Sequence, residues 1–285
     1  MKTIYKLLLF FIFIFAFPAV AEELNYELIE TPTGKPASFE SIQLRLESTN
    51  VIVLGEEHDD RVFHQLSLDL FKSLSQKFPI SLSLEMLERD QQTIINEYLS
   101  GVIGEKQLFA SIVHWKNFKE DYFPLVQFAK ENQIPVLCSN PPRRYVNLIT
   151  QKGLLAYQSF PPAAEPFLPD AYRLEKYLAA DYKERLNQLF SGHHGGAGPK
   201  TEFMILAQAT WDQGMADSIS RERYRSGRKV FHINGRFHSD REGGVVYRLR
   251  QMGESVLVLS GFSKGKEDPS DFKKIADFVI LTNGR

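Results

Sequence analysis

Two copies of a Gly-x-x-His tetrapeptide carry the side chains best suited to chemistry. The first copy is GEEH, at Gly55–His58, and the second is GRFH, at Gly235–His238. Each copy follows a short apolar run that ends at or near the glycine, which is the pattern of a buried strand. In an open α/β sheet, ligands bind just beyond the carboxyl ends of the strands. We therefore expect His58 and His238 to lie at a site, and the alternative for each is a satisfied polar residue at a strand end.

A third candidate is Glu85, which follows the apolar run at residues 80–84. A carboxylate at the tip of a buried strand is costly unless it is paired or ligated. With His58 and His238, Glu85 could bind a divalent metal such as zinc or manganese, or it could act as a general base. Glu56 is a further catalytic candidate that could instead support a ligand from behind. The alternative for Glu85 is that it only caps the helix that follows.

Alternating strands and helices must position these residues. Short apolar runs predict strands, and apolar residues at helical spacing predict the helices between them. The predicted strands cover residues 51–54, 80–84, 134–138, 230–234, 255–259 and 278–281, and the clearest predicted helices cover 62–78, 202–224 and 244–251. This order indicates an α/β fold with a central, mainly parallel β-sheet flanked by helices. Residues of about 90–190 form a helical layer in this prediction, inserted over the carboxyl edge of the sheet.

Two of the predicted helices carry polar residues near the expected site. His64 lies on the helix at 62–78, where a solvated position on the helix surface is the more common role. Gln208, Trp211 and Asp212 lie on the helix at 202–224 and could reach the site from it.

The first 21 residues have the pattern of a secretory signal peptide. Lys2 and Lys6 precede an apolar run, and the Ala-Val-Ala at residues 19–21 has the small-x-small form of a cleavage site. The apolar run is shorter than the roughly 20 residues of a membrane-spanning helix, so an uncleaved membrane anchor is the less favoured alternative. We expect residues 22–285 to form a single α/β domain that is periplasmic or secreted after cleavage.

Charge and cysteine content exclude several classes of protein. The formal net charge is −1, and it becomes −3 without Lys2 and Lys6, so nucleic acid is not an expected partner. Cys138 is the only cysteine, which excludes an internal disulfide, a multi-cysteine metal site and a c-type haem attachment motif. Export without disulfides favours the periplasm of a bacterium over a small extracellular scaffold.

Several motifs together resemble the ChaN family of haem-binding uptake proteins. These motifs, in chain order, are GEEHDD, SLEMLERDQQ, the YFPL that begins at Tyr122, LCSNPPR, AQATWDQGMADSI and GRFHSDREGGVVYRL. The resemblance extends over residues of about 35–282. The family belongs to a superfamily with the Tiki/TraB proteases and the erythromycin esterases. This chain differs from the lipoproteins of the family in having no cysteine near residue 21.

The resemblance implies an exported protein that binds haem, or a related iron porphyrin, for iron or haem uptake. It also implies a haem-linked homodimer and contact with an uptake system. Haem iron accepts His, Tyr, Cys or Met as ligands. Our candidates for the iron ligand are Tyr122, Tyr172, His193 and His194. For Tyr122 the alternative is packing in the core, and for Tyr172 it is packing at a helix surface. For the histidines the alternative is a mobile linker at residues 192–199. Arg236 could pair with a haem propionate or a carboxylate, or could block a wider pocket.

Two functions therefore remain open on the residues alone. The first is an exported haem-binding protein, which the resemblance favours. The second is a metal-dependent hydrolase that uses His58, Glu85 and His238, because the Tiki branch has two Gly-x-x-His motifs and an acid for that chemistry. The paired motifs suit the hydrolase better than they suit haem binding.

Overall fold

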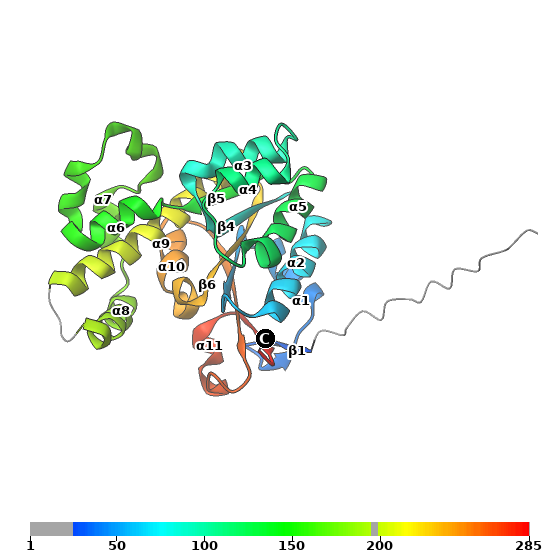
Figure 1. Cartoon of the computed structure of the whole chain (residues 1–285). Helices are drawn as coiled ribbons and strands as arrows, with labels where there is room; N and C mark the ends of the chain where they lie inside the picture. The colour runs from blue at the N-terminus through cyan, green and yellow to red at the C-terminus, as the bar shows by residue number, and fades with distance from the viewer. Residues whose placement is uncertain (1–24, 195–198, 285) are drawn as a thin grey trace, which may run out of the picture.

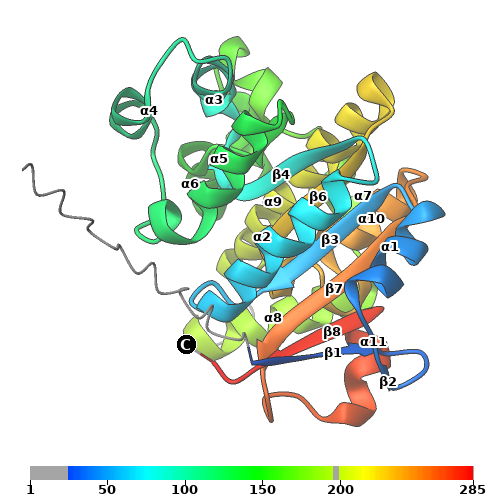
Figure 2. The ribbon, with the colours of Figure 1, turned by 90° about the vertical axis from the view of Figure 1, so that its right-hand side faces the viewer.

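The computed structural model of the chain describes residues 25–194 and 199–284, with the backbone alone at residues 192–194 and 199. Its centre is an eight-stranded sheet in the order β2-β1-β8-β7-β3-β6-β4-β5 (Figures 1 and 2). The strands are β1 (Tyr26–Glu30), β2 (Lys35–Pro36), β3 (Val51–Glu56), β4 (Ile80–Glu88), β5 (Val136–Asn140), β6 (Lys229–Gly235), β7 (Val256–Ser263) and β8 (Phe278–Thr282). The predicted signal peptide lies outside the described residues.

The sheet is mixed but mainly parallel, as predicted. Parallel pairing joins β3 to β6 and β7, β4 to β5 and β6, and β7 to β8. Strand β1 is antiparallel to both β8 and β2. The sequence did not predict the β1–β2 hairpin. The residues of β1, YELIE, show only a weak alternation of apolar and polar side chains, and Leu28 is the one buried residue among them.

Helices cover both faces of the sheet. They are α1 (Phe39–Glu47), α2 (Arg61–Ser75), α3 (Gln92–Leu99), α4 (Glu105–Ser111), α5 (Phe123–Glu131), α6 (Arg143–Lys152), α7 (Ala171–Lys176), α8 (Ala180–His194), α9 (Pro199–Ser226), α10 (Gly244–Gln251) and α11 (Phe272–Ile275). Figure 2 shows α1 and α2 on one side of β3, and α9 and α10 on the other. None of the helices in the described ranges combines the length and apolarity needed to cross a membrane.

The apolar run of β3 supplies core to both faces. Ile52 and Leu54 join the cluster that includes α1, α2 and α5, whereas Val51 and Val53 join the cluster that includes α9, α10 and α11. Side chains alternate between the two faces of a strand, so a strand buried on both faces has a continuous apolar sequence. This burial explains why VIVL predicts a central strand.

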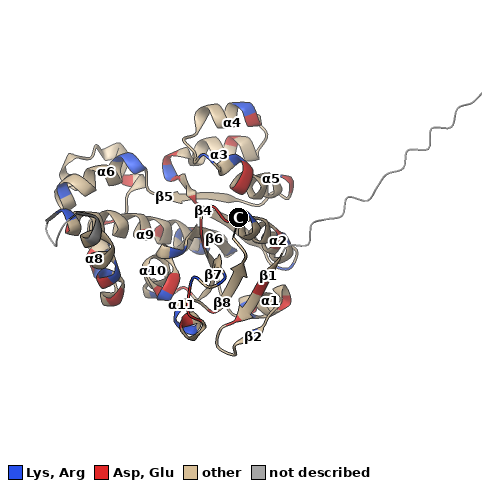
Figure 3. Ribbon diagram, turned by 60° about the horizontal axis from the view of Figure 1, so that its bottom comes forward, with Lys and Arg blue, Asp and Glu red and all other residues tan. Residues whose placement is uncertain are grey.

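The helical layer predicted at about 90–190 is present and is interrupted only by β5. Breaks near residues 101–104 and 114–115 separate α3 from α4, and α4 from the π-helical turn Phe118–Tyr122. Helices α6 and α7 extend to one side of the sheet in Figure 1. Acidic and basic residues both occur along the helices in the ribbon of Figure 3, consistent with the near-neutral net charge.

Candidate functional site

The two Gly-x-x-His motifs pack directly against each other at the carboxyl ends of β3 and β6. Their glycines permit this approach. A Cβ on Gly55 would lie 2.5 Å from Ser239 Oγ and 2.9 Å from the Cα of Arg236. A Cβ on Gly235 would lie 2.6 Å from His58 Nε2. Each glycine therefore leaves room for the chain that follows the other strand, and this brings His58 to the end of β6.

His58 lies in the short turn between β3 and α2. Asp60 ends this turn as the N-cap of α2, because its Oδ1 accepts the backbone N–H of Phe63 at 3.0 Å. Asn117 Nδ2 donates to the backbone oxygen of His58 at 2.8 Å, and the Trp115 ring stands edge-on to the imidazole, with 4.7 Å between the ring centroids. These contacts hold the imidazole from one side, yet 42% of the His58 side chain stays exposed.

Glu56 orients this imidazole from behind. The carboxylate is 1% exposed, and its Oε1 lies 3.0 Å from His58 Nδ1. The hydroxyl of Tyr122 also donates to Oε1, and His64 Nε2 lies 3.3 Å from Oε2. Burial by itself would raise the pKa of Glu56, but the bonds and charges of His58 and His64 outweigh it and lower that pKa. An ionised Glu56 accepts the Nδ1 proton of His58, which leaves Nε2 facing the site.

His64 is buried rather than on the helix surface, so that interpretation of the sequence was wrong. Its ring lies between Glu56 and Asp121, with 3.5 Å from Nδ1 to Asp121 Oδ2. Burial alone would lower the pKa of His64, but these two carboxylates raise it. His64 thus packs against the buried carboxylate of Glu56 and supports the orientation of His58.

His238 is the second imidazole of the site, and a separate carboxylate holds it. Its Nδ1 lies 2.5 Å from Oδ1 of Asp212, and its Nε2 lies 3.5 Å from Oε1 of Glu85. Tyr182 donates its hydroxyl to Asp212 at 3.0 Å, and Gln208 Nε2 lies 3.0 Å from His238 Nδ1. Burial would lower the pKa of His238, but the negative charges of Glu85 and Asp212 raise it to about 9. His238 is therefore an imidazolium at neutral pH.

Glu85 lies between the two imidazoles but has both oxygens engaged. Its Oε2 accepts the backbone N–H of Gly235 at 2.7 Å, and its Oε1 faces His238. Its charge also raises the pKa of His58, together with the bond from Glu56. Within the described ranges, no three His, Cys, Asp or Glu side chains form a group that could hold a metal ion. The predicted zinc or manganese site at His58, Glu85 and His238 is therefore not supported: His58 pairs with Glu56, and Glu85 pairs with His238 and the backbone of Gly235.

A cleft of about 650 Å³ opens beside these residues. Its wall comes from the β3–α2 turn, α8, the 3₁₀ turns after β6 (Arg236–His238 and Asp240–Glu242) and the loop after β7. The carboxyl end of β3 and helix α8 lie at the same end of the sheet in Figure 2. Four cations line the cleft, namely Arg185, Arg236, Arg241 and Lys266, and Leu189 and Phe237 add apolar surface. This volume is in the range of small-molecule sites.

The sequence matches the family model described as haem-binding uptake, Tiki superfamily, ChaN, over residues 43–249. The chain belongs to this family. The resemblance seen in the motifs is thus confirmed. No sequence among the curated proteins matches the chain.

Two solved structures resemble this chain in fold, and a third is less similar. ChaN of Campylobacter jejuni, solved with cofacial haem binding, has a TM-score of 0.68 and 21% identity over 91% of this chain and 97% of its own. A succinoglycan biosynthesis protein has a TM-score of 0.51 and 10% identity over 86% of this chain and 91% of its own. An erythromycin esterase has a TM-score of 0.46 and 12% identity over 91% of this chain and 83% of its own. At its low identity, the match to ChaN shows the fold.

The haem-ligand candidates of this ChaN-family chain lie in different places. Tyr122 is fully buried behind Glu56, and burial with that charge raises the pKa of its hydroxyl. Tyr172 is 70% exposed on α7. Arg236 pairs with carboxylates, at 2.6 Å from Asp240 and 2.9 Å from Glu267. The side chains of His193 and His194, at the end of α8, lie outside the described residues.

The sequence assigns no definite role to four residues of the site. It indicates only that Gln208 and Asp212 could reach the site, and it gives no role to Tyr182 or Asp121. Gln208 and Asp212 reach His238 from α9, whereas Trp211 packs into the core. The i, i+4 spacing of Gln208 and Asp212 was the available signal, because such residues share one face of a helix. Tyr182 and Asp121 gave no signal, since their partners lie far away in the sequence.

Proposed function

We propose that this ChaN-family chain binds haem or a related iron porphyrin in the cleft beside His58 and serves in haem uptake. The match to the haem-binding uptake family over residues 43–249 carries this proposal. The structure in which ChaN of Campylobacter jejuni binds haem cofacially supports it, because the two proteins share a fold.

The chemistry of His58 suits an iron ligand. The imidazole is a common axial ligand of haem iron, and metal-binding histidines usually donate their second ring nitrogen to a carboxylate. Glu56 supplies that carboxylate at 3.0 Å, and His58 keeps an exposed side chain. When bound, haem would supply the iron; Glu56 would hold the ring orientation and raise the basicity of Nε2. Tyr172, exposed on α7, is the alternative ligand.

The cations of the cleft suit the propionates of haem. Arg185 donates from Nη2 to the backbone oxygen of Asp240 at 3.2 Å, and among the described residues no carboxylate pairs with its guanidinium. The guanidinium lies over the rings of Tyr182 and Phe237, at 5.2 and 5.9 Å from their centroids. Arg185 would hold one propionate, because charged hydrogen bonds to carboxylates are strong. Lys266, which pairs with Glu57, would exchange that carboxylate for the second propionate. Arg236 is already paired and has a supporting role in this proposal.

The same proposal includes export. The signal-peptide pattern at residues 1–21 supports cleavage and release of residues 22–285, as one domain, into the periplasm or beyond. There the chain would form a haem-linked homodimer and pass haem to an uptake system. Size in solution, with and without haemin, tests the dimer.

Hydrolysis is the second candidate function. The observation that favours it is His238 between Asp212 and Glu85, with the exposed His58 on the other side of Glu85. An imidazolium at His238 would stabilise a developing oxyanion, and His58 would move a proton at Nε2. Hydrolysis of an activated ester that is lost in His238→Gln would favour this candidate.

A haemin titration of the mature protein tests the main proposal. We expect a saturable shift of the Soret band at one haem per chain, with a larger size in solution at saturation. The absence of saturable binding at micromolar haemin would contradict the proposal. Ester hydrolysis by the same haem-free sample would then favour the second candidate.

A further inference from the structure

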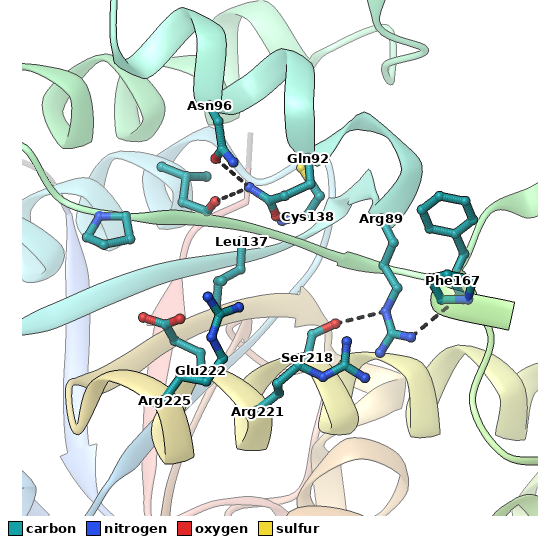
Figure 4. Close-up of a pocket in the computed structure, with 13 residues that line it drawn as sticks. Arg89, Gln92, Asn96, Leu137, Cys138, Phe167, Ser218, Arg221, Glu222 and Arg225 are labelled. Atoms are coloured by element: carbon teal, nitrogen blue, oxygen red, sulfur yellow. Dashed lines mark hydrogen bonds between the residues drawn. The ribbon is translucent and has the colours of Figure 1, made fainter. Parts of the chain in front are cut away.

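A second pocket lies on the other side of β4, away from the His58 cleft. It has a volume of about 340 Å³ and runs along the edge strand β5, between α3 and α9. Figure 4 shows Gln92 and Asn96 on the α3 side of β5, and Ser218, Arg221 and Arg225 on the α9 side. The pocket shares no lining residue with the cleft. It is large enough for a small organic molecule.

Arg89 is a buried cation of this pocket with only neutral partners. Its side chain, 7% exposed, donates from Nε to Ser218 Oγ at 2.9 Å, and its other nitrogens reach the backbone oxygens of Phe167 and Gly214. Among the described residues, no carboxylate lies within ion-pair distance of it. Burial and the nearby charge of Arg221 lower the pKa of Arg89 to about 10. The pocket therefore holds a positive charge that no carboxylate of the described residues pairs with directly, although the nearby charge of Asp217 offsets it in part.

Two exposed arginines add to this charge. Arg221 and Arg225 lie four residues apart on α9, where like charges repel each other by a few tenths of a kcal/mol. In the part of the chain that the structure describes, neither forms an ion pair. Glu222 is the one acid in the lining, and it accepts the hydroxyl of Ser81 at 2.8 Å. Three arginines against one glutamate give the lining a formal charge of about +2.

Much of the remaining lining is apolar, beside the polar side chains of Gln92, Asn96 and Ser218. Pro135, Leu137, Pro166 and Phe167 supply carbon surface beside the arginines. A free inorganic ion would leave this surface exposed to water. A ligand with both an anionic group and a short hydrocarbon part would contact the arginines and the apolar surface at the same time.

We propose that this pocket binds a small organic anion, with a carboxylate or phosphate group held by Arg221 and Arg225 and a short apolar part against Pro135 and Phe167. Arg89 contributes positive charge from the base of the pocket. Arg221 and Arg225 contribute the donors that remain free, in the planar geometry that suits either group.

Calorimetric titration of the mature protein with butyl phosphate and with hexanoate, at low salt, tests this proposal. We expect at least one of them to bind saturably at one site per chain, and the tighter one identifies the head group. In the double variant Arg221→Gln/Arg225→Gln, affinity falls about tenfold or more, because charged hydrogen bonds are lost. In Glu222→Gln it rises a few-fold, since a repelling charge is removed.

The matched control is Lys106→Gln/Lys183→Gln, which removes the same charge from exposed positions outside the pocket. Its affinity stays within a factor of two of that of the wild type. Equal weakening in both double variants, or no saturable binding of either anion to the wild type, would overturn the proposal. Arg225→Gln alone serves as a second variant if the double variant unfolds at a lower temperature than the wild type. We expect haemin binding to stay at the wild-type level in these variants, because the two pockets share no lining residue, so this test and the haem test can fail separately.

Discussion

Gly235 makes room for His58: a Cβ at Gly235 would lie 2.6 Å from Nε2 and 2.8 Å from Cε1 of the imidazole. The backbone of Gly235 has a φ of −59°, which any residue can adopt, so the glycine serves packing rather than conformation. The two Gly-x-x-His motifs are thus one structural unit, in which the glycine of the second motif determines the position of the histidine of the first.

Gly235→Ala should therefore displace the imidazole of His58 with little loss of fold stability. The contact is with the tip of a side chain that is 42% exposed and can move. We expect haem affinity to fall about tenfold, while the free energy of unfolding changes by about 1 kcal/mol or less. Haemin titration and urea denaturation measure the two quantities.

Gly104→Ala is the control for this substitution. Gly104 also has a negative φ, and its Cβ would contact only Gln107 Oε1 at 3.1 Å. The haem affinity and the free energy of unfolding of Gly104→Ala should stay close to those of the wild type. Unchanged haem affinity in Gly235→Ala would show that the position of His58 does not matter for the ligand.

Glu56→Gln should weaken haem binding without removing it. Glutamine fits the same space but lacks the negative charge that makes His58 Nε2 more basic. Loss of such a supporting carboxylate commonly lowers metal affinity 10- to 100-fold, so we expect a loss of about that size. The exposed Glu242, paired with Arg250, gives the matched control Glu242→Gln. A haem affinity that falls equally in both variants would contradict the role of Glu56.

His238 should make the haem-free protein less stable as the pH rises. Its folded pKa of about 9 lies above the value of about 6.5 in an unfolded chain. Its stabilisation is complete below pH 6.5 and is lost between pH 6.5 and about 9, by up to about 3 kcal/mol. Urea denaturation over this range should show a decline that is shallower in His238→Gln. An equally steep decline in the variant would contradict the assigned ion pairs with Asp212 and Glu85.

His232 should make the protein less stable as the pH falls, opposite to the effect of His238. Burial and the nearby charge of His238 lower its pKa to about 3, and its Nδ1 lies 2.9 Å from Ser83 Oγ. The unfolded chain takes up this proton near pH 6.5 and the folded chain does not, so stability falls by up to about 1.4 kcal/mol per pH unit below pH 6.5. His232→Asn keeps a polar partner for Ser83 and should make the free energy of unfolding fall less steeply below pH 6.5. The same slope in both proteins would show that His232 is already protonated when folded.

The sequence predicted the parallel core and the meeting of His58 with His238, because both depend on local patterns. A continuous apolar run indicates a central strand, and parallel neighbours bring their carboxyl ends together. The match of Glu56 with Gly235 in the register of β3 and β6 makes this meeting possible.

The sequence could not predict how the acids are divided between the histidines. Glu56 pairs with both His58 and His64 because α2 directs the side chain of His64 inward. Asp212 pairs with His238 because α9 crosses the same sheet. Such pairs depend on how helices dock, which local spacing does not specify. For the same reason, Tyr122 was a candidate iron ligand in the sequence but lies behind the site in the fold.

Haem affinity of His58→Ala, compared with that of wild type and of Tyr172→Phe, tests the central claim most directly. His114→Ala, which removes an exposed imidazole outside the cleft, is the control. We predict that His58→Ala loses at least about tenfold in affinity and changes its Soret spectrum, while Tyr172→Phe and His114→Ala bind as the wild type does. Wild-type affinity and spectrum in His58→Ala, with loss of binding in Tyr172→Phe, would contradict the claim and place haem at α7.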